Sequence, residues 1–552
     1  MKKNCVASRK EFEVTDKDLK FYEKIGVPVP DLCFQERLRR RMAWRNERTL
    51  YKRKCSATGK DIVSIYNENY PGLVYSPDKY WEDGWDAKDS GRDFDFNRPF
   101  FEQFKELYLA TPQISLITKE TENSEYTHDA MRLKNCYLTF DGEQARDCMY
   151  GETFALINDC MDFLYLQNSE LCYEVINCDN CYDLKFSQNC QNCSESWFLR
   201  NCIGCKNCFG CSNLRQKQYY IYNQPHTKKE YEEFLAGFDS GSFKVIETLK
   251  KNAHKFWNQS FVKYYSGMQN ENSTGDCISN CKDSEMCFDS DHLRDCKFCT
   301  NCAVSMNDCY DIDIWGNKVE LCYDCVVIGE GVNNVKFSYY VAFGVENVDY
   351  SAFCWNNSKH LFGCTGMKHA EYCILNKQYS KEEYFVMRDR IIKHMKNGGE
   401  WGGFFPTEIS PFAYNETVAQ EFFPMTKEAV LANGWKWREY GSSNDKGRVS
   451  KPKISDKISE IKDLICDEVL ACKTCAKNYK IQKAELGFYR KMNLPVPRKC
   501  SNCRHLERRK AKNPRELFDR NCGDCGRKVE TAVSVDRPEK VLCEDCYLKK
   551  VN

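Results

Sequence analysis

Residues 135–181 read NCYLTFDGEQARDCMYGETFALINDCMDFLYLQNSELCYEVINCDNC. Cysteine recurs here and just beyond at intervals of 12 residues, as Cys136, Cys148, Cys160 and Cys172 and then as Cys178, Cys190 and Cys202. A short fixed period is typical of a solenoid, whose units are too small to bury a face alone and must stack. Small Asn-Cys and Asp-Cys turns with aromatic residues between them predict a parallel β-solenoid with ladders of aligned thiols.

The solenoid pattern occurs twice. FGCSNLRQKQYYIYNQPHTKKEYEEF from residue 209 matches FGCTGMKHAEYCILNKQYSKEEYFVM from residue 362. Each copy ends in a capping-box pattern, Thr227 with Glu230 and Ser380 with Glu383, which predicts that a helix closes each half. The second half keeps the repeat with fewer cysteines, so we expect apolar side chains to fill the core of its turns.

A second duplication joins the two ends of the chain. Residues 5–80 align with residues 472–547 without a gap, and FYEKIGVPVPDLC matches FYRKMNLPVPRKC. In the C-terminal copy, CxxC pairs come in fours with the spacing of zinc ribbons and treble clefs, which lets four thiolates converge tetrahedrally. We therefore expect two structural Zn²⁺ sites, with the ligands Cys472, Cys475, Cys500 and Cys503, and Cys522, Cys525, Cys543 and Cys546.

The N-terminal copy has lost most of these ligands. It keeps Cys5, Cys33 and Cys55, whereas the other positions hold Ser8, Glu36, Thr58, Ser76 and Lys79. Serine, threonine and lysine are poor zinc ligands, and Glu36 with two thiolates makes a weaker site. We expect a module that folds without metal on its apolar and aromatic residues.

The remaining cysteines leave alternatives open. Cys202, Cys205, Cys208 and Cys211 form CxxCxxCxxC, close to an iron–sulfur spacing, but the last gap is one residue short, no Pro follows, and the run lies in register with the repeat. Buried thiols are the favoured interpretation. Further zinc at some CxxC pairs is an alternative.

Both terminal copies carry a basic tract after the second half-site, RLRRRMAWRNERTLYKRK at 37–54 and RHLERRKAKNPRELFDR at 504–520. Arginines interleaved with aromatic residues suit contact with phosphates and bases. The alternative is a solvated helix, or one that pairs with acidic segments of the chain. The candidate nucleic-acid-binding residues are Arg37, Arg39, Arg40, Arg41, Arg45, Arg48, Arg504, Arg508, Arg509 and Arg515.

These patterns divide the 552 residues into seven segments. The fold class is mainly β, a two-part parallel β-solenoid with helical inserts, flanked by zinc-ribbon-like or treble-clef-like modules. The segments are a degenerate zinc-finger-like module (1–82), a helical connector (83–125) with a helix at 97–112, the first solenoid half with its closing helix (126–260), the second (261–398), an aromatic wrap with a helix from about 426 (399–440), a linker and helix (441–470), and the double zinc module (471–552).

The composition restricts the classes of function. The formal charge of +1 argues against a uniformly basic nucleic-acid binder. The N-terminus lacks a signal-peptide pattern, and no apolar run is long enough for a membrane span, so we expect a cytoplasmic protein without membrane contact. In a reducing compartment, the 36 cysteines are metal ligands or buried thiols.

The sequence gives no support for catalysis. It contains no P-loop, dinucleotide fingerprint, HExxH or nucleophile elbow, and we identify no catalytic residue and no small-molecule substrate. The eight histidines have no recognisable partner spacing. We lean against an enzyme.

The phrases YEKIGVPVP, RNERTLYKRKC, GRDFDFNRPFFEQF, FFPTEISPFAYNETVAQEFFP and DRPEKVLCEDCY together resemble an uncharacterised family of cysteine-rich proteins from candidate-phylum bacteria with small genomes. Residues 472–503 are also similar to a widespread module described as a probable zinc-binding domain. That resemblance implies zinc at Cys472, Cys475, Cys500 and Cys503. The family has no established activity, so the resemblance implies no mechanism.

Our leading hypothesis is a zinc-containing scaffold whose basic helices contact RNA, DNA or a ribonucleoprotein. The alternative is a structural or protein-interaction solenoid with purely structural zinc. A weaker alternative is a thiol-rich metal-handling or redox protein.

Overall fold

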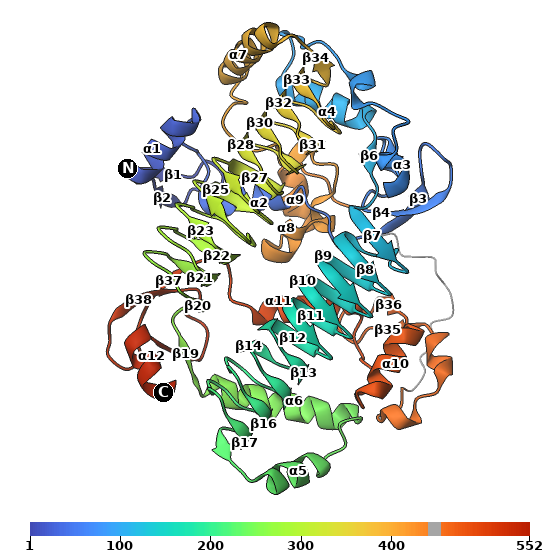
Figure 1. Ribbon diagram of the computed structural model, residues 1–552, viewed down its shortest axis with the longest axis vertical. Coiled ribbons are helices and arrows are strands. Elements are labelled where there is room, and N and C mark those ends of the chain that lie inside the picture. Colours follow the sequence, from blue (N-terminus) through green and yellow to red (C-terminus); the bar gives the residue numbers. More distant parts are fainter. Residues whose placement is uncertain (440–453, 552) are drawn as a thin grey trace. The chain divides into compact units, whose positions relative to one another are not determined.

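The computed structural model describes residues 1–439 and 454–551. The chain forms two compact units that do not follow its order (Figure 1). Unit 1 consists of Met1–Leu116, Tyr265–Arg438 and Arg515–Leu517, and unit 2 of Ile117–Tyr264, Glu439–Pro514 and Phe518–Asn552. Unit 1 therefore combines the N-terminal module with the second solenoid half. Unit 2 combines the first solenoid half with the C-terminal module.

The solenoid of unit 2 is a stack of parallel strands, which confirms the predicted fold class. Tyr137 pairs with Met149, Met149 with Met161 and Met161 with Tyr173, so each turn takes the predicted 12 residues. The first strand begins at Thr118, before the expected start at 126. The strands are β7 Thr118–Glu122, β8 His128–Lys134, β9 Tyr137–Arg146, β10 Met149–Asn158, β11 Met161–Glu170, β12 Tyr173–Asp179, β13 Tyr182–Lys185, β14 Gln188–Gln191, β15 Ser194–Trp197, β16 Lys206–Phe209 and β17 Gln218–Ile221.

Within each turn the backbone repeats every three residues. Asn177, Asn180, Asn189 and Asn192 have φ between 51° and 54°, and each is followed by a residue buried in the solenoid core. A left-handed conformation is costly for most residues, but Asn and Asp tolerate it. The Asn-Cys and Asp-Cys pairs thus place a left-handed residue before an inward-pointing thiol.

Asparagine side chains also join successive turns. Asn177 Nδ2 donates to Asn189 Oδ1 over 3.0 Å, and Asn189 Nδ2 donates to Asn201 Oδ1 over 3.0 Å. A second ladder runs from Asn123 through Asn135 to Asp147. These bonds satisfy side chains that the left-handed backbone projects from the turns, as in other stacked parallel β-structures.

Thiols fill the core and donate to backbone carbonyls. Cys148 Sγ and Cys160 Sγ each donate to the carbonyl two residues earlier, over 3.1 Å in both cases. Burial raises the pKa of both thiols well above its ordinary value. The run Cys202, Cys205, Cys208 and Cys211 lies in the same buried cluster, and each of its thiols also donates to the carbonyl two residues earlier.

The solenoid of unit 1 uses longer turns. Tyr310 pairs with Tyr323 and Tyr339 with Ala352, a register of 13 residues. Near the two ends the register is shorter, with 11 residues between β20 and β21 and 12 between β21 and β22 and between β32 and β33. The added residue sits where two consecutive residues are left-handed, as at Phe343–Gly344 and Asn356–Asn357. Sequence reasoning did not resolve this change of period.

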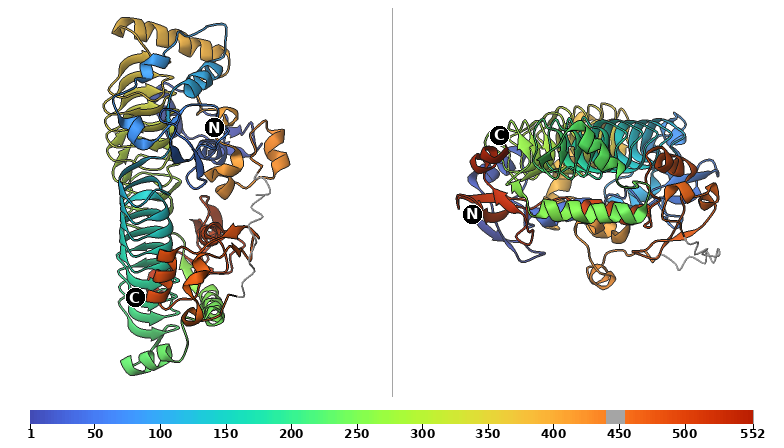
Figure 2. Two further views of the ribbon diagram at one scale, coloured as in Figure 1. Left: turned by 90° about the vertical axis from the view of Figure 1, so that its right-hand side faces the viewer. Right: turned by 90° about the horizontal axis from the view of Figure 1, so that it is seen from below.

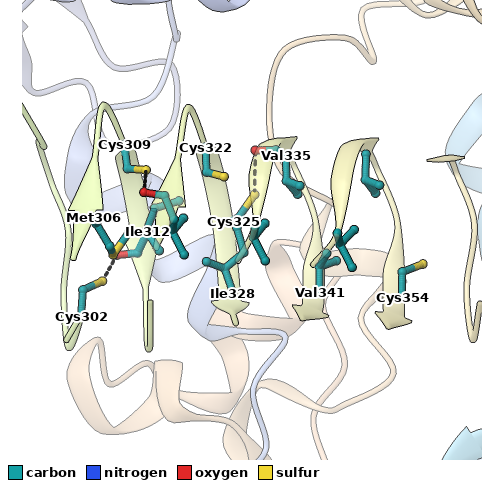
Figure 3. Close-up of a cluster of buried hydrophobic side chains, with 14 of the residues drawn as sticks. Cys302, Met306, Cys309, Ile312, Cys322, Cys325, Ile328, Val335, Val341 and Cys354 are labelled. Carbon is teal, nitrogen blue, oxygen red and sulfur yellow. Dashed lines mark hydrogen bonds between the residues drawn. The ribbon is translucent and has the colours of Figure 1, made fainter. Parts of the chain in front are cut away.

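Apolar side chains replace many thiols in this second core, as expected. Figure 3 shows Val335, Val341 and Ile328 stacked with Cys325 and Cys354. The strands are β20 Gly267–Met268, β21 Gly275–Ser279, β22 Cys287–Asp291, β23 Leu293–Arg294, β24 Met306–Asn307, β25 Tyr310–Asp313, β26 Val319–Glu320, β27 Tyr323–Ile328, β28 Asn333–Lys336, β29 Tyr339–Ala342, β30 Glu346–Asp349, β31 Ala352–Trp355, β32 Lys359–Phe362 and β33 Glu371–Ile374.

A hairpin strand and a helix follow each solenoid. β18 (Gln224–Pro225) turns back on β17 before α5 (Lys228–Ala236), and β34 (Lys377–Gln378) turns back on β33 before α7 (Lys381–Asn397). Both predicted capping boxes are present at these helices. The duplicated closing helices are therefore confirmed.

The N-terminal module belongs to unit 1 with the aromatic wrap. Its elements are β1 Lys2–Asn4, β2 Glu11–Glu13, α1 Asp16–Ile25, α2 Phe34–Met42, β3 Tyr51–Lys54, β4 Asp61–Ser64, β5 Val74–Tyr75 and α3 Pro77–Trp81. The predicted helices near 97–112 and 426 are α4 (Phe100–Ala110) and α9 (Lys427–Ala432), and α8 spans Val418–Phe422. β5 pairs in parallel with β6 (Gln113–Ile114).

The C-terminal module repeats this order of elements in unit 2. The elements are β35 Leu470–Ala471, β36 Asn478–Tyr479, α10 Lys483–Lys491, α11 Ser501–Ala511, β37 Phe518–Asn521, β38 Lys528–Thr531, β39 Lys540–Leu542 and α12 Glu544–Val551. β39 pairs in parallel with β19 (Phe261–Lys263), as β5 does with β6. α6 (Phe243–Asn258) lies beside the rungs of the same unit (Figure 2).

The short helix expected before the C-terminal module is replaced by two 3₁₀ turns, Ile458–Glu460 and Asp463–Cys466. Arg490 Nη2 donates to the carbonyl of Ile461 over 2.8 Å, which takes the place of a helical partner. Ile458 and Ile465 pack into the core between the solenoid, α6 and α10. Most of the expected linker, 441–453, lies outside the described residues.

In the described ranges no helix has both the length and the apolar character needed to cross a membrane.

Candidate metal centre

The first four-cysteine group forms where a hairpin meets a helix. Cys472 and Cys475 lie in the turn between β35 and β36, and Cys500 is the N-cap of α11, with Cys503 in its first turn. The turn closes through Ala476, whose φ is 58° and whose N–H donates to the carbonyl of Cys472 over 3.0 Å. The Sγ atoms of Cys475 and Cys500 lie 3.8 Å apart, and all four sulfurs are within 4.8 Å of one another.

The second group is built in the same way. Cys522 and Cys525 lie in the turn between β37 and β38, and Cys543 and Cys546 lie at the start of α12. Gly526, with φ of 75°, occupies the place that Ala476 has in the first turn. The Sγ atoms of Cys525 and Cys543 are 3.6 Å apart, and the four sulfurs again lie within 4.8 Å of one another.

The sulfur spacing fits a tetrahedral metal ion. With metal–sulfur bonds of about 2.3 Å, the edge of the sulfur tetrahedron is about 3.8 Å. The distances of 3.8 Å and 3.6 Å match that edge. Four protein sulfurs leave no open position for a substrate, so the geometry is that of a structural site. Soft thiolates do not suit Ca²⁺ or Mg²⁺.

Backbone N–H groups support one sulfur of each group. Cys472 Sγ accepts from the N–H groups of Cys500 over 3.3 Å and Thr474 over 3.4 Å. Cys522 Sγ accepts from Cys543 over 3.3 Å. Burial raises the pKa of these two thiols, but the backbone N–H donors outweigh it and lower the pKa of each to about 6. The thiolate, which is the form that binds metal, is thereby stabilised.

The N-terminal module gives the equivalent positions other partners. Ser8 Oγ lies 3.6 Å from Cys33 Sγ, in hydrogen-bond contact, and Glu36 forms an ion pair with Arg39. Lys79 pairs with Glu82 over 2.7 Å. The N-terminal module has the same order of helices and strands as the C-terminal module. The residues that stand in place of its cysteines form hydrogen bonds and ion pairs within the chain.

The arginines of α2 that face the solenoid are buried in ion pairs. Arg37 Nε donates to Asp311 Oδ2 over 2.8 Å, and Arg41 Nη1 donates to Asp324 Oδ1 over 2.6 Å. Arg45, just after the helix, pairs with Asp313. Each of these three arginines is at most 5% exposed.

α11 makes the equivalent contacts in unit 2. Arg504 Nε lies 2.9 Å from Asp162 Oδ2, Arg508 Nη1 donates to Asp162 Oδ1 over 2.8 Å, and Arg509 pairs with Glu152. Arg504 and Arg508 occupy the positions of Arg37 and Arg41 in the duplicated module. The same helix thus anchors each module to a solenoid.

The remaining candidate arginines also have partners in the chain. Arg39 stacks on Trp435, with 4.9 Å between the guanidinium carbon and the ring centre, and Arg40 Nε donates to the carbonyl of Phe405 over 3.2 Å. Arg48 lies 3.9 Å from Glu421, and Arg515 lies 3.4 Å from Asp313. The structure therefore shows these side chains in intramolecular contacts, and their binding to nucleic acid stays a prediction.

Sequence reasoning did not identify the solenoid aspartates that form ion pairs with the arginines of α2 and α11. Asp162, Asp311 and Asp324 have φ of 57°, 58° and 49°. They therefore stand at the left-handed positions of the three-residue repeat. An Asp at such a position, directly after an apolar or aromatic residue, was the available signal.

Comparisons with known proteins add little to this site. No family model matches the chain, and no curated protein matches it. Among solved structures, a protein of Desulfovibrio desulfuricans G20 described as a "putative acetyltransferase" is similar over 48% of this chain and 68% of its own, with 7% identity and a TM-score of 0.12. A likeness this weak carries no argument about fold or function.

Proposed function

We propose that the protein is a scaffold built on its β-solenoids, in which two structural Zn²⁺ ions fold the C-terminal module and hold it on the solenoid of unit 2. The carrying observation is the order of residues in α11. Cys503, a ligand of the first group, is followed directly by Arg504, which reaches Asp162 of β11. Metal binding at the start of the helix is thereby coupled to docking of the helix.

Zinc is the proposed ion because its preferences match the donor set. It takes four thiolates in tetrahedral structural sites, and CxxC pairs on turns and helix starts are its usual source of ligands. The free energy of binding becomes free energy of folding, about 10–16 kcal/mol in zinc-finger peptides. Thiolate sites and free core thiols both need a reducing compartment, which supports a cytoplasmic location.

The proposed role is interaction rather than catalysis. Each four-cysteine group supplies four sulfur ligands and leaves no open position for a substrate. In both units, arginines of the helix that follows Cys33 or Cys500 form ion pairs with aspartates of the solenoid. These contacts support the structural-zinc hypothesis over the nucleic-acid hypothesis.

Hydrogen exchange with and without a zinc chelator tests the coupling. Chelation should speed exchange in α10, α11 and α12 and in β10–β12, which contact α11. Exchange in α2 and β25–β27 of unit 1 serves as the internal control. Unchanged exchange in α11 after complete metal removal would contradict the proposal.

A further inference from the structure

Unit 2 contains a cavity of about 280 Å³ between its solenoid, α6 and the C-terminal module. The turn at Pro495–Lys499 and the end of α11 close one side. α6 contributes residues at helical spacing, so one face of the helix lines the cavity. The volume lies near the lower limit for small-molecule sites, about 300 Å³.

The walls are largely aromatic and apolar. Tyr173 and Phe186 come from the solenoid, Phe243 and Trp257 from α6, and Pro497 from the turn. Phe186 and Trp257 are at most 6% exposed. Such walls suit a flat ring, which can stack on aromatic faces without losing hydrogen bonds.

Two hydrogen-bond donors of the lining residues are buried and unused. Trp257 Nε1 and Arg508 Nε have no partner among the residues that the structure describes. Each side chain is 3% exposed, and both residues line the cavity. Indole and guanidinium N–H groups only donate, so the missing partner is an acceptor. A buried donor without a partner lowers stability, and a bound acceptor would remove that cost.

Charge favours an anionic acceptor. The lining residues include five cations, Lys250, Arg498, Lys499, Arg504 and Arg508, and three carboxylates, Glu174, Glu247 and Glu507. Lys250 pairs with Glu174 over 2.8 Å, and Lys499 pairs with Glu507 over 2.5 Å. Arg504 and Arg508 share Asp162, which lies outside the lining. Arg498 donates to backbone carbonyls and is the cation that gives the lining its positive charge. We propose that this cavity binds a small aromatic carboxylate, whose ring packs against the aromatic walls and whose carboxylate accepts from Trp257 and Arg508.

Calorimetric titration of the zinc-loaded full-length protein with indole-3-acetate tests the proposal, with indole and acetate as probes that lack one half of the ligand. We expect saturable binding of indole-3-acetate and much weaker binding of either half. Trp257→Phe keeps the ring and removes the donor, and should weaken binding about tenfold. Ala511→Trp should fill the cavity and abolish binding.

Lys251→Gln is the matched control, because Lys251 is an exposed residue of α6 that does not line the cavity. It should bind indole-3-acetate like the unaltered protein. The proposal is overturned if the unaltered protein shows no saturable binding, since the cavity is then a hydrated packing gap. It is also overturned if Ala511→Trp, folded by circular dichroism, binds with unchanged affinity.

Discussion

Arg41 Nη1 donates to Asp324 Oδ1 over 2.6 Å, and neither side chain is more than 2% exposed. Its counterpart in the duplicated module, Arg508, donates to Asp162 Oδ1 over 2.8 Å. One position of a duplicated helix therefore fixes each terminal module to a solenoid. Of the two copies, the C-terminal one has the four-cysteine groups, whereas the arginine anchor is present in both.

Removal of one partner of a buried ion pair leaves the other charge uncompensated. Arg41→Met should lower the free energy of unfolding by about 3–5 kcal/mol, because Asp324 then loses its cationic partner and keeps the N–H of Phe404. Lys24→Met is the control, since Lys24 pairs with Asp308 at the surface and should contribute at most about 1 kcal/mol. Urea denaturation followed by circular dichroism measures both. Equal effects would show that the buried pair is not an anchor.

The left-handed asparagines give a graded prediction. Asn189, with φ of 54°, bonds to Asn177 and Asn201. Asn189→Gly keeps the conformation and loses the ladder, whereas Asn189→Ala also adds a left-handed strain of about 1–2 kcal/mol. Thermal denaturation should therefore rank the proteins in the order unaltered, Gly variant, Ala variant. An Ala variant as stable as the Gly variant would show that the left-handed backbone does not select asparagine.

Core thiols should make stability fall in alkaline solution. Burial raises the pKa of Cys354 to about 12, whereas the pKa of a cysteine in the unfolded chain is about 8.5. Between these values the native state keeps a proton that the unfolded state loses, so stability decreases as pH rises. Cys354→Val should reduce that slope by about 1.4 kcal/mol per pH unit between about pH 9 and about pH 11. An unchanged slope in urea denaturation would mean that the thiol ionises in the native core.

The nucleic-acid hypothesis predicts salt-dependent binding of RNA, because neutralised phosphates release counterions. The intramolecular partners of the arginines lead us to expect no change in fluorescence anisotropy of labelled single-stranded RNA at low salt. A steep salt dependence that disappears in a variant with Arg39 and Arg40 changed to Glu would instead support nucleic-acid binding. A variant with Lys119→Glu and Lys206→Glu, at exposed positions of β7 and β16, matches this change in net charge.

The sequence predicted the features that depend on local repetition. The 12-residue period of Cys148 and Cys160 required stacked turns, and the capping boxes at Thr227 and Ser380 marked the closing helices. The CxxC spacing predicted both sulfur clusters, because turn and helix start alone bring those cysteines together.

Features that depend on long-range packing were not predictable. No local pattern shows that Arg508 meets Asp162, or that the N-terminal module joins the second solenoid half rather than the first. The 13-residue turns, by contrast, were missed although Cys296, Cys309 and Cys322 recur at intervals of 13 residues. Residues 455–470 form two 3₁₀ turns instead of one helix, and Arg490 binds the carbonyl of Ile461 between them.

The most direct test of the account is the metal content of protein purified under reducing conditions, measured by elemental analysis beside the variants Cys500→Ser and Cys543→Ser. We expect two zinc ions per chain, and one in each variant, because each substitution removes a ligand from a different four-sulfur group. Protein without zinc, protein with iron, or four or more metal ions per chain would contradict it.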